Sequence, residues 1–124
     1  MIACDTSSLV AFTQNAPGAD VNKVADALGA ALLVLPPATL TEFLSNPHTQ
    51  AAASALTAGL RILDIAPGYW RRAAASRATL IGKSLKARLA DALIAQSCID
   101  ADVPLITRDA DFRHFAKHCG LKLA

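Results

Sequence analysis

The strongest constraint on the fold is a set of short apolar segments that alternate with segments of helical spacing. The apolar segments predict four strands and one further edge strand: Met1–Asp5, Leu32–Leu35, Arg61–Ile65, Pro104–Thr107 and Gly120–Leu123. The second of them contains no polar residue and stops at a proline pair, which is typical of a strand buried in a parallel sheet. Strands alternating with helices indicate an α/β fold, a three-layer α/β/α arrangement around a central parallel sheet of about four to five strands.

The segments between these strands carry helical patterns and helix-ending signals. Helices are predicted over residues 6–12, Asp20–Ala31, Thr39–Leu44, Thr49–Gly59, Pro67–Ile81, Leu89–Ile99 and Asp109–Lys117. The hydroxyls of residues 6–8 are candidate N-caps for the first helix. Thr39 and Glu42 have the spacing of a capping box at the start of the third. The length of 124 residues fits one domain, so we expect a single domain over residues 1–124.

Composition narrows the class of protein. Hydrophobic residues make up 53% of the chain and aromatic residues 5%, so we expect a mainly aliphatic core. No apolar run approaches the roughly 18 residues of a membrane helix, and the first residues lack the basic start of a signal peptide. The three cysteines include no CxxC pair, which favours reduced thiols in a cytoplasmic protein, with Cys4 and Cys98 buried.

Charge is distributed unevenly along the chain. Residues 1–60 contain one basic and four acidic residues, whereas residues 61–124 contain eleven basic and six acidic ones. A basic surface can neutralise the phosphates of a nucleic acid, although a solvated helix face explains the same pattern equally well. The candidates for contacting nucleic acid are Arg71, Arg72, Arg77, Lys83, Lys86, Arg88 and Arg108.

Four acidic residues stand where functional side chains of α/β proteins gather. Asp5 and Asp109 follow the first and fourth predicted strands, so their carboxylates converge if those strands are neighbours. Glu42 is the only glutamate, and Asp91 lies in the first turn of a nearly apolar helix. Each alone is explained by helix capping or by the helix dipole. Together they would repel one another, and a divalent cation with carboxylate ligands removes that repulsion.

Four segments resemble the signature regions of a known family. They are Cys4–Val10, Ala38–Phe43, Leu89–Ala95 and Leu105–Phe112. In this order, along essentially the whole chain, they resemble the PIN domain, and most of all the VapC ribonuclease toxins of bacterial toxin–antitoxin systems. Residues 45–88 support this resemblance only through their basic charge.

The resemblance implies an endoribonuclease that hydrolyses RNA phosphodiester bonds by metal-activated water. It assigns the catalytic, metal-binding quartet to Asp5, Glu42, Asp91 and Asp109. The metal implied is Mg²⁺ or Mn²⁺. Asp111 becomes an auxiliary acid, Thr107 a hydroxyl that orients the carboxylates, and Ser7 a weaker candidate for that role. The resemblance also implies a homodimer, and inhibition by a cognate VapB antitoxin whose tail covers the site.

Two alternatives stay open at this point. A phosphatase of the haloacid dehalogenase type also has an aspartate after its first strand, but it needs a second aspartate where this chain has Ser7. A catalytically silent PIN-like module would bind RNA or protein without turnover.

Two other patterns are weak. Gly82-Lys83-Ser84 lacks the first glycine and the preceding strand of a P-loop, and the pair His114 and His118 lacks a clear third metal ligand.

Overall fold

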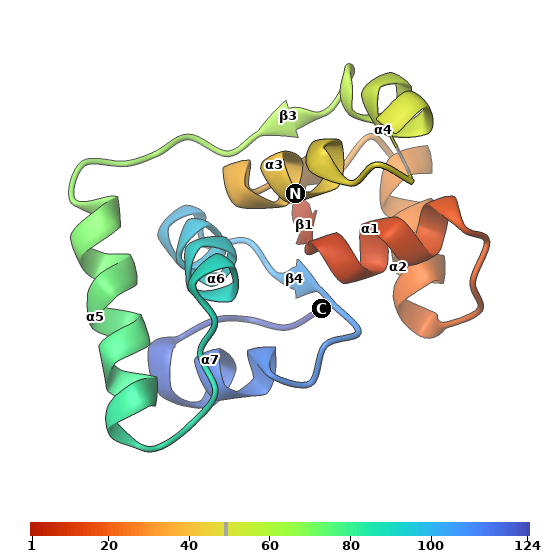
Figure 1. The fold of residues 1–124 in the computed structure, drawn as a ribbon. Helices are drawn as coiled ribbons and strands as arrows, with labels where there is room; N and C mark the ends of the chain where they lie inside the picture. The colour runs from red at the N-terminus through yellow and green to blue at the C-terminus, as the bar shows by residue number, and fades with distance from the viewer. Residues whose placement is uncertain (49) are drawn as a thin grey trace.

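A computed structural model of the protein describes residues 1–48 and 50–124 (Figure 1). Along these residues the elements are β1 (Ile2–Cys4), α1 (Thr6–Thr13), α2 (Ala19–Gly29), β2 (Leu33–Leu35), α3 (Pro37–Ser45), α4 (Gln50–Thr57), β3 (Arg61–Ile62), α5 (Tyr69–Gly82), α6 (Leu89–Ala101), β4 (Leu105–Ile106) and α7 (Phe112–Cys119). Their order is the predicted one. The predicted helix start at Thr49 lies outside the described residues.

The four strands form one parallel sheet in the order β3-β2-β1-β4. The chain passes from β1 to β2 to β3 and then returns to β4 on the other side of β1. Ala3 of β1 pairs with both Val34 of β2 and Leu105 of β4. The prediction that the first and fourth strands are neighbours is therefore confirmed. The reversal makes the carboxyl ends of β1 and β4 the topological switch point, where α/β sheets bind ligands.

Helices cover both faces of the sheet, so the predicted three layers are confirmed. Figure 1 shows α5, α6 and α7 on one side and α1 and α2 on the other. Successive strand residues enter two different cores because side chains alternate along a strand. Ala3 and Leu105 pack with residues of α5, α6 and α7, whereas Cys4 and Ile106 pack with residues of α1 to α4. The predicted edge strand at the C-terminus is reduced to one bridge between Leu105 and Leu123.

Proline and side-chain caps set two helix starts differently from the prediction. α1 is capped by the Asp5 carboxylate, which accepts from Ser8 N, and not by the hydroxyls that follow. α3 begins at Pro37 because proline is pre-organised for the first helical position. Thr39 therefore lies inside the helix, where its hydroxyl donates to the Cys4 carbonyl at 3.2 Å. Glu42 lies in the middle of α3 and forms no capping box.

The core is mainly aliphatic, as predicted, and contains a few deeply buried aromatic side chains. The largest fully buried side chains include Phe43, Phe112 and Phe115. The last two lie with their ring centroids 6.1 Å apart. Cys4 and Cys98 are buried free thiols, as predicted. Among the described helices, none is both long and apolar enough to cross a membrane.

Replacing Phe115 by alanine is expected to lower the free energy of unfolding by about 3–5 kcal/mol, because a fully buried ring is lost and a cavity remains. Urea unfolding followed by circular dichroism measures the change. Ile81→Ala is the control: Ile81 is 51% exposed, so its loss should cost less than about 1 kcal/mol. Equal losses in the two variants would contradict this assignment of the core.

Candidate metal centre

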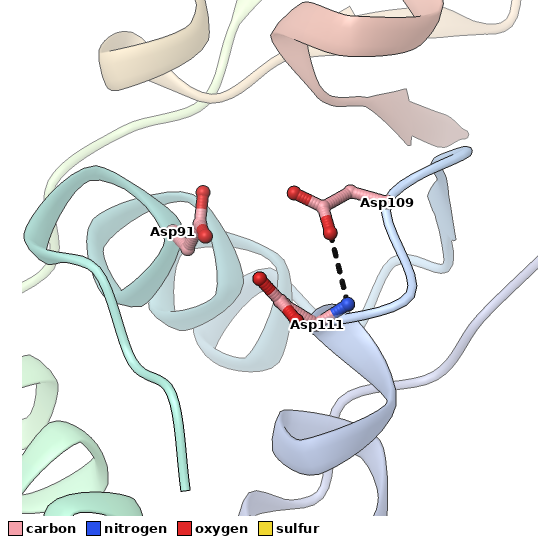
Figure 2. Close-up of side chains that lie close together, drawn as sticks. All are labelled: Asp91, Asp109 and Asp111. Carbon is pink, nitrogen blue, oxygen red and sulfur yellow. Dashed lines mark hydrogen bonds between the residues drawn. The ribbon is translucent and has the colours of Figure 1, made fainter.

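Three carboxylates meet beyond the carboxyl end of β4. Asp91 comes from the first turn of α6, and Asp109 and Asp111 come from the loop between β4 and α7. Each offers a carboxylate oxygen within 4.8 Å of those of the other two. Figure 2 shows the three side chains pointing toward a common space. In residues 1–48 and 50–124, this is the one group of three or more acidic, histidine or cysteine side chains with such spacing.

Local hydrogen bonds shape the loop that carries two of these acids. Thr107 Oγ1 accepts from Asp109 N at 3.0 Å, and Asp109 Oδ1 accepts from Asp111 N at 2.9 Å. Short polar side chains commonly hold turns in this way. The bonds keep residues 107–111 in a loop, so α7 begins at Phe112 and not at Asp109 as predicted. The loop thereby fixes the two carboxylates relative to each other.

Asp5 is buried at 3% exposure, and its carboxylate is surrounded by hydrogen-bond donors. Ser7 Oγ donates to both oxygens at 2.9 and 2.8 Å, Ser8 N donates to Oδ1 at 3.0 Å, and Thr107 Oγ1 donates to Oδ2 at 2.7 Å. Burial raises the pKa of Asp5, and these hydrogen bonds oppose the increase. Asp5 therefore ties the β1–α1 junction to the β4–α7 loop, through the two hydroxyls singled out by the resemblance.

Asp91 carries the clearest sign of a missing partner. Its Oδ2 is buried and has no hydrogen-bond partner in the part of the chain that the structure describes. Burial, followed by the negative charge of Asp109, raises the pKa of Asp91 to about 6, while Arg88 opposes the increase. A buried carboxylate oxygen without a hydrogen-bond donor is costly, and such an oxygen can instead serve as a ligand to a hard divalent cation. The donor set therefore fits a divalent metal ion.

Glu42 stands apart from this group of three. Its side chain is exposed on α3, and its Oε1 accepts from Thr6 Oγ1 at 2.6 Å. Its charge, like that of Asp5, still raises the pKa of Asp91. The structure thus brings Asp91 and Asp109 together with Asp111. Asp5 and Glu42 act on them electrostatically from outside the 4.8 Å group.

The basic residues proposed for RNA differ in their availability. Four make internal contacts: Arg72 with Asp100, Arg77 with the Ala87 carbonyl, Lys86 with Asp111 and Arg108 with Asp20. Lys86 Nζ lies 3.4 Å from Asp111 Oδ2 and so reaches the acidic group itself. Arg71, Lys83 and Arg88 are exposed. Lys86 and Arg88 are the members of the basic set that act on the acidic group.

Sequence reasoning missed three polar residues around the site. Thr6 binds Glu42, and Ser8 Oγ donates to Asp20 Oδ2 at 2.9 Å. Asp20 stands in the first turn of a helix, a common position for an acid, so its spacing gave no signal. Its partners come from other elements of the fold, and a local pattern does not report them.

The fold and the site define a class: a three-layer α/β domain with converging carboxylates at the switch point of a parallel sheet. The PIN domain family model matches residues 2–118, and the chain belongs to that family. This confirms the resemblance of the four segments and leaves the haloacid dehalogenase alternative without support. A comparison with curated protein sequences finds no match.

Solved structures share this fold over the whole chain. One is a chain of VapBC2 from Rickettsia felis bound to a DNA fragment from their promoter, with TM-score 0.76, 19% identity and coverage of 100% of this chain and 98% of that one. Another is from VapBC-1 of nontypeable Haemophilus influenzae, with TM-score 0.78, 19% identity and coverage of 100% and 97%. A third is from FitAcB of Neisseria gonorrhoeae, with TM-score 0.69, 19% identity and coverage of 99% and 96%. At these identities the likeness shows a common fold.

Proposed function

We propose that this protein is a metal-dependent endoribonuclease of the VapC type, the toxin of a toxin–antitoxin pair that acts in the cytoplasm. The observation that carries the proposal is the convergence of Asp91, Asp109 and Asp111 at the switch point, with the buried Asp91 Oδ2 facing no donor among the described residues. Membership of the PIN domain family and the shared fold with chains of VapBC complexes support it.

The acidic residues of the site have different proposed roles in the reaction. Asp91, Asp109 and Asp111 would hold Mg²⁺ or Mn²⁺, and Asp5 and Glu42 would complete the acidic set of the reaction, as the resemblance implies. When bound, such an ion supplies an acidified water for attack and offsets charge on the phosphoryl oxygens. Asp5 holds Thr107 and so keeps the β4–α7 loop in place. Glu42 adds to the negative charge at Asp91.

Basic residues beside the carboxylates would hold the RNA backbone. Lys86 lies against Asp111, and Arg88 is exposed next to the start of α6. Arg71 and Lys83 are also exposed and are further candidates for contacting RNA. Cations placed near phosphates provide most of the affinity for nucleic acid, and that affinity falls with salt.

A protein partner fits the apolar surface next to the site. Trp70, Ile81 and Leu89 are 63%, 51% and 61% exposed, and they line a recess between α5 and α6. A second recess that shares Trp70 and Leu89 reaches Glu42. Exposed apolar surface of this kind marks interaction sites. The proposed occupants are the antitoxin and a second copy of this chain.

Cleavage of RNA is expected to require both a divalent ion and Asp109. Purified protein should cut a mixed RNA substrate with Mg²⁺ or Mn²⁺, stop with EDTA, and resume when the metal is restored. Asp109→Asn should lower the rate at least about 100-fold. Asp102→Asn is the control, since Asp102 is exposed and pairs with Lys122 away from the carboxylate group. Cleavage in EDTA would refute the proposal, and binding of RNA without cleavage would favour the silent module.

A further inference from the structure

A bidentate ion pair joins the loop of the metal centre to α2. Arg108 lies between Thr107 and Asp109 in the chain. Its Nε donates to Asp20 Oδ2 at 2.9 Å and its Nη2 donates to Asp20 Oδ1 at 3.1 Å, with a further bond from Nη2 to the Pro17 carbonyl at 3.1 Å. Paired guanidinium and carboxylate groups of this geometry are stronger and more directional than single contacts. The side chain of Arg108 is therefore directed to α2.

The same carboxylate is connected to Asp5 through a buried serine. Ser8 is fully buried; its hydroxyl donates to Asp20 Oδ2 at 2.9 Å and its backbone N donates to Asp5 Oδ1 at 3.0 Å. Asp5 in turn accepts from Thr107, the residue before Arg108. These contacts close a ring through α1, α2 and the β4–α7 loop. The hydrogen bond from Arg108 is the main reason that the pKa of Asp20 is lowered to about 2, so Asp20 is ionised at neutral pH.

The backbone around the pair leaves room for it. Gly18 has a φ of +151°, and a Cβ added there would lie 2.5 Å from Asp20 Oδ1 and 2.9 Å from Arg108 Nη2. Both distances are shorter than side-chain contacts tolerate. A side chain at residue 18 would therefore strain the backbone and displace the ion pair, without changing either charged group. This provides a probe of the pair that is independent of its charges.

We propose that Asp20 is a positioning residue of the metal centre: it holds Arg108, and through it the β4–α7 loop, so that Asp109 and Asp111 face Asp91. The inference rests on the metal centre of the proposed function, but its Mn²⁺-binding test does not require the protein to cut RNA. In this proposal Arg108 belongs to the ion pair with Asp20 and is not free to contact RNA. Residues that hold metal ligands in place typically change metal affinity or activity 10- to 100-fold when mutated.

The test measures Mn²⁺ affinity by isothermal titration calorimetry on folded, metal-free protein. We expect Asp20→Asn, Arg108→Gln and Gly18→Ala each to weaken Mn²⁺ binding about 10-fold or more. The double variant of Asp20 and Arg108 should bind Mn²⁺ only slightly more weakly than either single variant, because both changes break the same ion pair. Asp26→Asn, an exposed acid on the same helix, is the matched control and should bind Mn²⁺ as the wild type does.

Steady-state kinetics on RNA separate positioning from the other roles. Loss of positioning lowers kcat in the Asp20 and Arg108 variants with KM nearly unchanged, whereas loss of an RNA contact would raise KM in Arg108→Gln alone. A purely structural pair would lower the unfolding midpoint and leave Mn²⁺ affinity and kcat unchanged. The inference is overturned by a raised KM in Arg108→Gln alone, or by a lower unfolding midpoint with unchanged Mn²⁺ affinity and kcat. A wild type that binds no Mn²⁺ also overturns it. If Gly18→Ala and Arg108→Gln weaken Mn²⁺ binding but the wild type cuts no RNA, the proposed function fails and the positioning role of the Asp20–Arg108 pair is still supported.

Discussion

Asp91→Asn is expected to lower RNA cleavage at least about 100-fold and, at the same time, to make the metal-free protein more stable. The loss of activity follows from removing one of the three converging carboxylates. The gain in stability follows from the position of Asp91, whose Oδ2 is buried and faces no hydrogen-bond donor among the residues described. An uncharged amide of the same shape relieves both the burial of charge and the repulsion from Asp109.

The pH dependence of this gain has a definite sign. The pKa of Asp91 is raised from 3.8 to about 6 in the folded protein, so the proton is bound more tightly when folded than when unfolded. The stabilisation by this proton is full below about pH 4 and is lost as the pH rises through about 6. The difference between Asp91→Asn and the wild type should therefore grow over that range. Because Asp91 is only half-buried, screening limits the gain to about 1 kcal/mol.

Urea unfolding in EDTA at pH 4.5 and pH 7.5 measures this effect, with Asp102→Asn as the exposed control. Excess Mg²⁺ should then reverse the order of stability. An ion that binds the folded wild type stabilises it by about 2.7 kcal/mol at 100 times its dissociation constant, and the variant that lacks a ligand gains less. A variant that is less stable than the wild type in EDTA at pH 7.5 would show that Asp91 is held by an interaction other than a metal ion.

Asp5→Ala is expected to remove both activity and stability. The Asp5 carboxylate caps α1 and accepts hydrogen bonds from Ser7, Ser8 and Thr107. Its removal leaves a buried backbone N–H without its acceptor and frees the β4–α7 loop. The lost helix cap and the unsatisfied buried N–H are the same interaction at Ser8, so we expect a loss of roughly 1–3 kcal/mol.

The matched comparison is Glu42→Ala. Glu42 is exposed and accepts one hydrogen bond from Thr6, so its loss should change the unfolding free energy by less than about 1 kcal/mol. If Glu42 contributes to the reaction as the resemblance implies, cleavage falls in this variant while the fold is retained. Urea unfolding and RNA cleavage on the two variants give the answer together. Asp5→Ala with wild-type stability would contradict the structural role of this carboxylate.

The order of elements and the parallel sheet followed from local patterns. Apolar runs bounded by prolines and acids mark short buried strands, and their alternation with helices leaves few arrangements. Besides the C-terminal edge strand, the predictions that were wrong concern helix starts, where two local rules compete. A capping box at Thr39 was overridden by Pro37 at the first helical position. The cap of α1 came from Asp5, because its carboxylate is held there by contacts from the β4–α7 loop as well.

The sequence predicted only part of the candidate site. Asp5 and Asp109 could be placed at one edge of the sheet because each follows a strand, and the carboxyl ends of parallel strands share an edge. What each acid does there depends on its burial and on partners from distant segments. Asp111 joins Asp91 and Asp109, and Asp20 reaches Arg108 across 88 positions of the chain. Sequence spacing thus identified the acids, whereas the burial of each acid and its contacts with distant segments are decided only by the tertiary structure.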